Sequence, residues 1–424
     1  MSLMGLIFVA LLALGVPIAF VMGIAGSAGL YWMDLRLMLI PQRMFNGVDS
    51  FILLAAPFYI LAGELMSRSG ITRRLVRLST LLTGHFRGGT AFGSVLSAVL
   101  FSGISGTAVG DTAALGQIYI REMPKEGYKT EYAAALVVAG SMIGPIVPPS
   151  VTLVILSAVS QISIIDLFIA GIIPGLLLAA GVALVILLHV FTRGLPRSKF
   201  SLDGEPVWKV IAEGLLVIML PVILVGGALS GIFTTTEAGG VAVIYTLFLG
   251  GVVFRKLGPQ AIWQALLTTA RISASIYLVL AASEILSYAM TTAGISGWVR
   301  GLGPMFAGHP TLFLLAMVLF LIGLGAVLEP GPAIVIFVPL LLPVARAMGI
   351  DPLQFSIVFV LTLALGLSTP PIGLCLFIAC KIGRIGMGKL FGALWPFFVA
   401  EKLVVIALVM VPWFSTYLVH WIRG

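Results

Sequence analysis

The amino-acid sequence predicts an all-α polytopic membrane protein with an inverted-topology repeat, two re-entrant hairpins and two discontinuous helices. Three observations lead to this prediction. Of the 424 residues, 60% are hydrophobic and 9% are charged, and the mean hydropathy is +1.17. A glycine- and proline-rich segment occurs twice, and corresponding loops of the two halves differ in basic charge. Such a composition excludes a soluble globule.

The repeated segment reads Gly-Pro-Ile-Val-Pro-Pro-Ser at 144–150 and Gly-Leu-Ser-Thr-Pro-Pro-Ile at 366–372. Its first glycine and its paired prolines recur at one constant offset between the two copies. Proline lacks a backbone donor and clashes with the preceding helical turn, so each copy should break a helix within the membrane. The freed carbonyl groups cannot face lipid, and must therefore line a protected cavity or bind a cation. Paired breaks of this kind indicate the binding site of a secondary transporter.

The N-terminal region contains two apolar segments, residues 3–33 and 51–66. We expect the first to be one long or broken span that is retained, because it lacks the basic start of a signal peptide. Arg36 and Arg43 then fall in a loop on the outer side, against the positive-inside rule. Residues 71–87 alternate arginine with leucine, which predicts an amphipathic helix at the cytoplasmic interface.

The first hairpin is predicted from two apolar arms, residues 90–101 and 112–120. Each arm is too short to cross a hydrocarbon core that needs about 20 residues. The tip at 102–111 is rich in glycine and serine, so we expect a re-entrant hairpin whose tip is buried in protein. Residues 131–163 then form a span broken at the first repeated segment, and residues 167–191 return to the inside.

The central region starts with a polar linker at 192–209, which carries four basic residues and belongs in the cytoplasm. Helices are expected at 208–231, 238–254 and 262–290. The next loop, 291–310, holds a single arginine, whereas residues 68–87 of the first half hold five. This opposite charge bias predicts two halves of opposite topology.

The second half repeats the plan of the first. Short arms at 311–323 and 333–345 enclose a tip at 324–332, and a broken span at 353–380 precedes a last span at 390–418. We divide the chain into five parts: N-terminal scaffold spans and amphipathic arm (1–89), first transport repeat (90–191), linker with central scaffold spans and second arm (192–310), second transport repeat (311–389) and C-terminal span (390–424). The second arm is expected near residues 294–300.

These motifs resemble a known family. The hairpin tip at 102–106, both proline breaks, Gly-Ile-Asp-Pro at 349–352 and Thr-Thr-Thr-Glu-Ala at 234–238 are similar to the large membrane (M) subunit of tripartite ATP-independent periplasmic (TRAP) transporters. The resemblance covers nearly the whole chain. Thr235 departs from it, because the family often has proline there. The tip departs as well, with Gly106, Thr107 and Asp111 where many members are richer in serine or alanine.

The resemblance implies a sodium-driven carrier of the elevator type in the bacterial inner membrane. Its partners would be a small membrane subunit (Q), a soluble periplasmic substrate-binding protein (P) and membrane lipids. Two or more transported Na⁺ ions would bind where the hairpin tips meet the helix breaks. Their ligands, carried over by motif, are Ser102, Ser105, Gly144, Val147 and Pro148 at one site and Gly325, Gly366, Thr369 and Ile372 at the other. Hydroxyls and freed carbonyls supply the oxygen ligands that hard cations prefer.

The family generally transports small carboxylates, and sialic acid and C4-dicarboxylates both fit. The predicted substrate contacts are Ser105, Thr107, Asp111 and Ser150. A hydroxyl-bearing acidic tip favours a polyhydroxylated sugar acid, because Asp111 would repel the second carboxylate of a dicarboxylate. On this reasoning, Asp111→Asn should impair transport of a polyol and leave sodium binding intact. An alternative role for Asp111 is to cap its own helix.

Other polar residues have simple structural interpretations beside the functional ones. The serines of the first tip could bond back to the preceding helical turn. Glu329 could act as a gate or substrate contact, or as a local cap. Glu64 lies four residues before Arg68, which favours an ion pair along a helix. Glu237 follows Thr234 at the spacing of a capping box.

The sequence argues against several classes of function. The histidines lack metal-ligand spacing and no phosphate-binding Walker motif is present, so neither metal catalysis nor ATP hydrolysis is predicted. The protein is not expected to be an enzyme. Its net charge of +8 indicates positive-inside bias and no nucleic-acid surface. The remaining alternatives are a C4-dicarboxylate or other sugar-acid TRAP carrier and a stand-alone sodium/dicarboxylate symporter.

Overall fold

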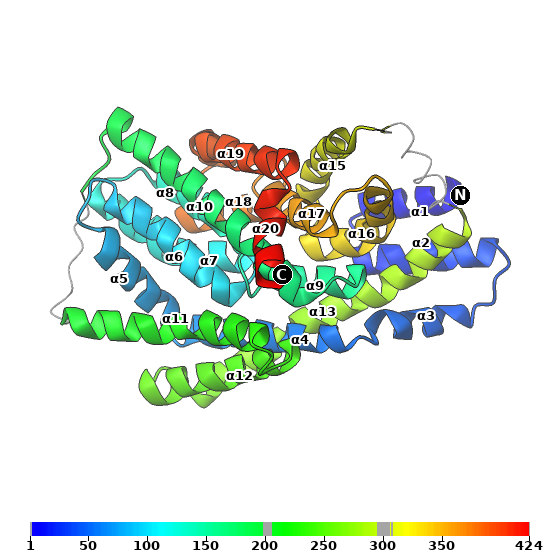
Figure 1. Cartoon of the computed structure of the whole chain (residues 1–424), viewed down its shortest axis with the longest axis horizontal. Coiled ribbons are helices and arrows are strands. Elements are labelled where there is room, and N and C mark those ends of the chain that lie inside the picture. The colour runs from blue at the N-terminus through cyan, green and yellow to red at the C-terminus, as the bar shows by residue number, and fades with distance from the viewer. Residues whose placement is uncertain (1, 198–205, 295–305, 307, 424) are drawn as a thin grey trace.

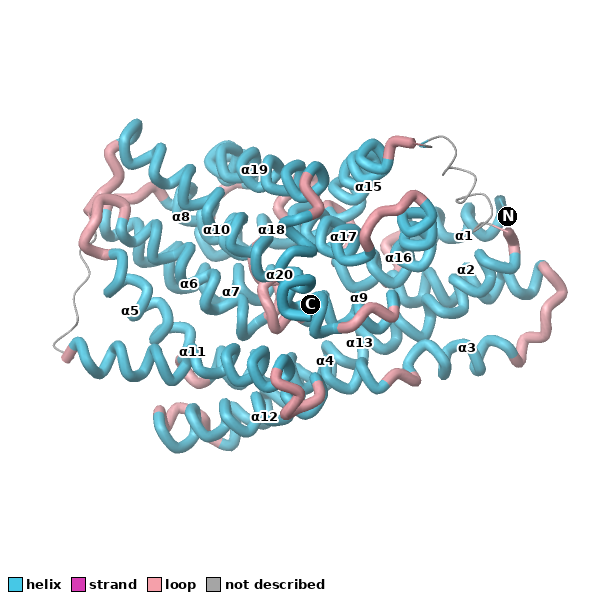
Figure 2. Tube along the Cα trace, in the orientation of Figure 1, coloured by secondary structure: helices cyan, strands magenta, loops and turns pink. Residues whose placement is uncertain are grey.

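The computed structural model describes residues 2–197, 206–294, 306 and 308–423. Helices joined by short loops make up the described chain, as predicted (Figures 1 and 2). The first half contains α1 (Ser2–Ala13), α2 (Ile18–Trp32), α3 (Leu39–Val48), η1 (Phe51–Leu54), α4 (Ala55–Arg68), α5 (Ile71–Thr83), α6 (Gly89–Ser105), α7 (Ala108–Glu122), η2 (Met123–Glu126), α8 (Thr130–Ser141), α9 (Val151–Ser160) and α10 (Ile164–Arg193).

The second half contains α11 (Val207–Leu229), α12 (Thr235–Leu247), the π-helical turn η3 (Phe248–Val253), α13 (Pro259–Thr292), α15 (Pro310–Gly325), α16 (Pro330–Ala347), α17 (Pro352–Gly366), α18 (Leu374–Gly383), α19 (Met387–Met410) and α20 (Trp413–Arg423). Six helical segments in the described residues are long and apolar enough to cross a membrane, judged by length and composition.

The internal repeat is visible in the helix starts. α7 and α8 begin at Ala108 and Thr130, and α16 and α17 begin at Pro330 and Pro352, at the same offset that relates the two proline segments. Both predicted broken spans are present as the pairs α8 with α9 and α17 with α18. A cis peptide bond joins the two prolines of each break. The two proline segments therefore interrupt helices at equivalent places.

The N-terminal segment is broken and folds back on itself. Gly15 adopts a left-handed φ of +76° between α1 and α2, and Pro17 precedes α2. A β-carbon built on Gly29 near the end of α2 would lie 2.7 Å from the sulfur of Met4 at the start of α1. The two helices are therefore antiparallel neighbours, and the segment is not one long span.

Arg43 lies in a helix, so the prediction of a loop around it was wrong. Its guanidinium forms an ion pair of 3.8 Å with Glu284 of α13 and lies 3.8 Å from the ring centre of Tyr288. Helix α3 packs along α13 at the lower right of Figure 1. Glu284 of α13 therefore explains why a cation stands at position 43. The pairing could not be predicted, because the two residues are far apart in the sequence.

Both hairpins are confirmed, but their tips are shorter than predicted. The sequence placed the first tip at 102–111, whereas α6 continues to Ser105 and α7 starts at Ala108. Gly106 supplies the turn with a φ of +63°, and the Thr107 hydroxyl accepts a hydrogen bond from the Gly110 N–H at 3.2 Å. The chain thus reverses at a left-handed glycine followed by a capping threonine.

The C-terminal segment is two helices, and the prediction of a single span over 390–418 was wrong. α19 ends at Met410, and α20 starts after Pro412, whose ring cannot continue the helix. Arg423 of α20 forms an ion pair of 2.6 Å with Asp166 of α10. This contact holds α20 back against the body of the protein.

The amphipathic helix predicted over residues 71–87 is present as α5, and its position at the cytoplasmic interface stays a prediction. Its Leu75 and Leu78 are buried, and Arg74 forms an ion pair of 2.8 Å with Glu213 of α11. α11, α4 and α3 follow one long edge in Figure 1 with α12 beside α4, while the hairpin and broken helices lie on the other side. The second arm, expected near 294–300, lies outside the described residues apart from Gly294. The division into transport and scaffold parts stays a prediction.

Candidate functional site

A cavity of about 1030 Å³ lies between the two hairpin tips. Its walls are the first tip at 105–110, the second tip at 327–332, and parts of α4, α9 and α13. A cavity of this size is large enough for a small organic ligand such as a sugar acid. It is therefore the candidate substrate site.

The polar side chains that line this cavity come both from the predicted transport repeats and from the predicted scaffold. The polar side chains that line it are Ser105, Thr107, Gln117, Thr152 and Glu329 from the hairpins and α9, and Glu64, Ser67, Arg271 and Ser275 from α4 and α13. The structure thus brings two of the four predicted substrate contacts, Ser105 and Thr107, into one cavity. It also brings Glu329 of the second tip to the same space.

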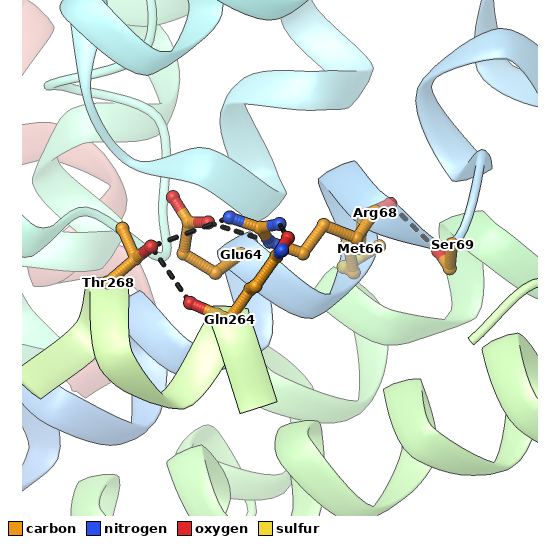
Figure 3. Close-up of polar contacts among 6 residues, drawn as sticks. All are labelled: Glu64, Met66, Arg68, Ser69, Gln264 and Thr268. Carbon is orange, nitrogen blue, oxygen red and sulfur yellow. Dashed lines mark hydrogen bonds and ion pairs between the residues drawn. The ribbon is translucent and has the colours of Figure 1, made fainter. Parts of the chain in front are cut away.

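Glu64 is held in the predicted ion pair with Arg68 (Figure 3). Nε of Arg68 lies 3.3 Å from the Glu64 carboxylate, and its two terminal nitrogens donate to Gln264 at 2.8 Å and Thr268 at 3.4 Å. The arginine therefore balances the charge of Glu64 and ties α4 to α13 at the edge of the cavity. Neither Arg271 nor Glu329 has an ion-pair partner in the described part of the chain.

The first hairpin tip lies directly against the first helix break. A β-carbon on Gly106 would stand 2.8 Å from the carbonyl oxygen of Pro149, and one on Gly103 would stand 3.4 Å from that of Pro148. No side chain larger than hydrogen fits at Gly106 without a shift. The structure therefore brings the first tip and the proline carbonyls of the first break together. A cation site at this contact stays a prediction.

Asp111 is buried beside this contact, outside the cavity. Its side chain is fully buried, and neither carboxylate oxygen has a hydrogen-bond partner among the described residues. One of these oxygens would clash with a β-carbon built on Gly144, so the carboxylate faces the first break. An unpartnered buried carboxylate is costly unless another group satisfies it.

The second tip meets the second break in the same way. A β-carbon on Gly366 would stand 2.5 Å from the Cα atom of Gly325. The N–H of Gly373 also donates to the carbonyl oxygen of Ala326 at 3.3 Å. Two of the four residues predicted for the second cation site are therefore in direct backbone contact.

The remaining predicted residues make local contacts. The hydroxyls of Ser102 and Thr369 donate back to the carbonyls of Val99 (2.7 Å) and Leu365 (2.9 Å). Ser150 is buried, caps α9 and donates to the Pro145 carbonyl at 2.6 Å, so its hydroxyl does not line the cavity. Val147 packs against Gly175 of α10, and Ile372 is 39% exposed.

Sequence reasoning did not single out Arg271 or Gln117. Arg271 is the only basic residue in the long helix α13, and an arginine in a long apolar helix usually has a functional reason. An arginine in such a helix could therefore have been recognised from the sequence as a candidate functional residue. Gln117 gave no signal, because only the packing of α7 against the other helices directs it into the cavity.

Comparison with known proteins identifies the family. Residues 6–414 match the DctM component of the tripartite ATP-independent periplasmic transporters. The chain belongs to this family. It is an inner-membrane protein, and its named relatives are transporters.

Several relatives of this chain have names. One is the 2,3-diketo-L-gulonate TRAP transporter large permease of Escherichia coli, which is 33% identical to this chain over 95% of this chain and 94% of the relative. Two large permeases of Vibrio cholerae also match. The one named for sialic acid is 35% identical (88% and 87% covered), and the one named for C4-dicarboxylates is 32% identical (100% and 98% covered).

The fold also matches a solved structure. The YdaH transporter of Alcanivorax borkumensis, described as having an unusual topology, superposes with a TM-score of 0.64. The alignment covers 88% of this chain and 87% of that one at 16% sequence identity. This likeness concerns the fold alone.

Proposed function

We propose that this DctM-family chain imports an organic carboxylate, with sialic acid as the first candidate, by coupling its entry to the inward flow of sodium ions. The single observation that carries the proposal is the cavity between two pseudo-symmetric hairpin tips, each of which abuts a helix break. Breaks of this kind present free backbone groups next to the substrate in secondary transporters.

The first sodium site, in this proposal, includes Asp111. Its buried carboxylate has no hydrogen-bond partner among the described residues and faces Gly144 of the break. A sodium ion there would satisfy it, together with hydroxyl and carbonyl oxygens of Ser105 and Pro148. We therefore assign Asp111 to cation binding and not to substrate contact. The second site would lie where Gly325 meets Gly366.

Transport would proceed by an elevator movement. The two hairpins and two broken helices would move together against α4, α11, α12 and α13. The cavity supports this division, because one wall comes from the hairpins and the other from α4 and α13. A small membrane subunit would complete the scaffold, and a soluble periplasmic protein would deliver the substrate, as the name of the tripartite family suggests.

The test is uptake of radiolabelled sialic acid into proteoliposomes that contain the full chain and its small subunit. Uptake should require both an inward sodium gradient and the soluble binding protein. Uptake that needs sodium but no binding protein would instead indicate a stand-alone symporter. If succinate enters under the full conditions and sialic acid does not, the chain is a C4-dicarboxylate carrier, like the relative named for that substrate.

A further inference from the structure

The two hairpin tips occupy equivalent positions but differ in charge. Thr107 and Glu329 correspond to each other in the internal repeat, and each directly precedes the second helix of its hairpin. The Thr107 hydroxyl is engaged as a helix cap, whereas the Glu329 side chain makes no capping bond. Glu329 is an exposed residue that lines the cavity, so its carboxylate is available to a ligand.

The second tip is also poor in backbone donors. Helix α16 opens with Pro330, Gly331 and Pro332, so two of its first three residues lack an N–H. Helix α7 opens with Ala-Val-Gly at 108–110, and all three of these residues carry one. Helix N-termini attract anions through these N–H groups. Prolines and a preceding carboxylate make the start of α16 unsuitable for an anion.

The unpaired charges that line the cavity have opposite signs on its two walls. Arg68 balances Glu64, which leaves Arg271 and Glu329 as the unpaired charges among the described lining residues. Arg271 belongs to α13, and Glu329 belongs to the second tip. A ligand that spans the cavity therefore meets a cation from one wall and a carboxylate from the other.

We propose that the cavity selects a monocarboxylate that carries hydroxyl groups, and that it discriminates against dicarboxylates. The ligand carboxylate pairs with Arg271, and the ligand hydroxyls donate to Glu329. A dicarboxylate would place its second negative charge against Glu329, and like charges held together in a cavity repel strongly. This inference rests on the proposed function, and it names the substrate class of that same site.

The experiment is equilibrium binding to the full chain purified with its small subunit, in saturating sodium and without the soluble binding protein. Leaving that protein out means that the measured preference belongs to the membrane site. The probes are sialic acid, 2,3-diketo-L-gulonate and succinate. The variants are Glu329→Gln and Arg271→Gln. Their matched controls are Glu122→Gln and Arg121→Gln, exposed residues at the end of α7 that do not line the cavity.

The two variants should differ in a way that a general loss of structure cannot produce. Glu329→Gln should weaken sugar-acid binding by about tenfold, since hydrogen bonds to a charged group are the stronger kind. The same variant should strengthen succinate binding. Arg271→Gln should weaken every anion by about tenfold or more, because the shared carboxylate loses its counterion. Neither control should change any affinity.

If Glu329→Gln folds poorly, a second variant at the same tip still tests the inference. Pro332→Ala restores one N–H donor at the start of α16 and keeps the carboxylate, so it should strengthen succinate binding modestly. Sugar-acid and succinate affinities that both stay unchanged, or shift in the same direction, in Glu329→Gln would overturn the inference. Tight binding of succinate alone by the wild-type chain would overturn it too, while leaving carboxylate import intact. If no probe binds in saturating sodium, both the inference and the proposed function fail.

Discussion

Gly325 and Gly366 touch through their backbones, at the point where the second hairpin tip meets the second helix break. A β-carbon on Gly366 would stand 2.5 Å from Cα of Gly325 and 2.9 Å from the N atom of Ala326. Real β-carbons do not approach other atoms so closely. The contact therefore requires glycine, and this requirement leads to the first prediction.

Gly366→Ala should force the tip and the break apart. Overpacking of this kind costs about 1–3 kcal/mol of stability. The melting temperature should fall, and the sodium concentration for half-maximal uptake should rise. Gly240→Ala is the control, because a β-carbon there meets no atom within 4 Å. Normal sodium dependence in Gly366→Ala would show that this contact has no part in cation binding.

Asp111→Asn should reduce sodium affinity at the first break. Removing the negative charge should raise the sodium concentration for half-maximal uptake by about tenfold or more, since a charged ligand contributes more than a neutral one. The measurement is sodium-dependent uptake at saturating substrate, with Glu122→Gln as control. An unchanged sodium dependence with a raised KM for substrate would restore the sequence-based expectation that Asp111 contacts the substrate.

Arg68→Gln should leave Glu64 as an uncompensated negative charge at the cavity. The partly exposed ion pair itself contributes at most about 1 kcal/mol to stability, so the chain should still fold. The KM for an anionic substrate should rise several-fold. The double variant Glu64→Gln/Arg68→Gln should recover most of the affinity, because the excess charge is gone. If the double variant is as impaired as the single one, the charge of Glu64 is irrelevant to substrate binding.

Thr107→Ala should remove the cap of α7. The lost hydrogen bond to the Gly110 N–H costs about 1 kcal/mol, and Thr107→Ser should retain it. Thermal unfolding of the purified chain measures the difference between the two variants. Equal melting temperatures would mean that the cap contributes nothing to stability.

Several features followed from the sequence because their causes are local. The breaks at 144–150 and 366–372 could be located because proline disrupts a helix wherever it occurs inside one. The pairing of Glu64 with Arg68 could be expected because side chains four residues apart on a helix are neighbours. The resemblance to the M subunit rested on such local motifs, and the family match confirms it.

The features that could not be predicted from the sequence depend on packing between helices. The antiparallel pairing of α1 with α2 and the partner of Arg43 depend on contacts between segments that the sequence does not relate. The direction in which a single side chain points also depends on contacts with distant segments. Asp111 and Ser150 were expected to face the substrate, and the packing of the first tip against its break places both outside the cavity.

By itself, the sequence determined that this protein is helical, lies in a membrane, repeats its plan in two halves and breaks a helix in each half. Composition, periodicity and proline stereochemistry act over short stretches of chain and can be read directly. Only the tertiary structure decided which polar groups share a cavity. Arg271 and Glu329 come from elements that are separated in sequence by the whole of α15, and it is the packing of α13 and α16 around one space that brings the two charges to the same site.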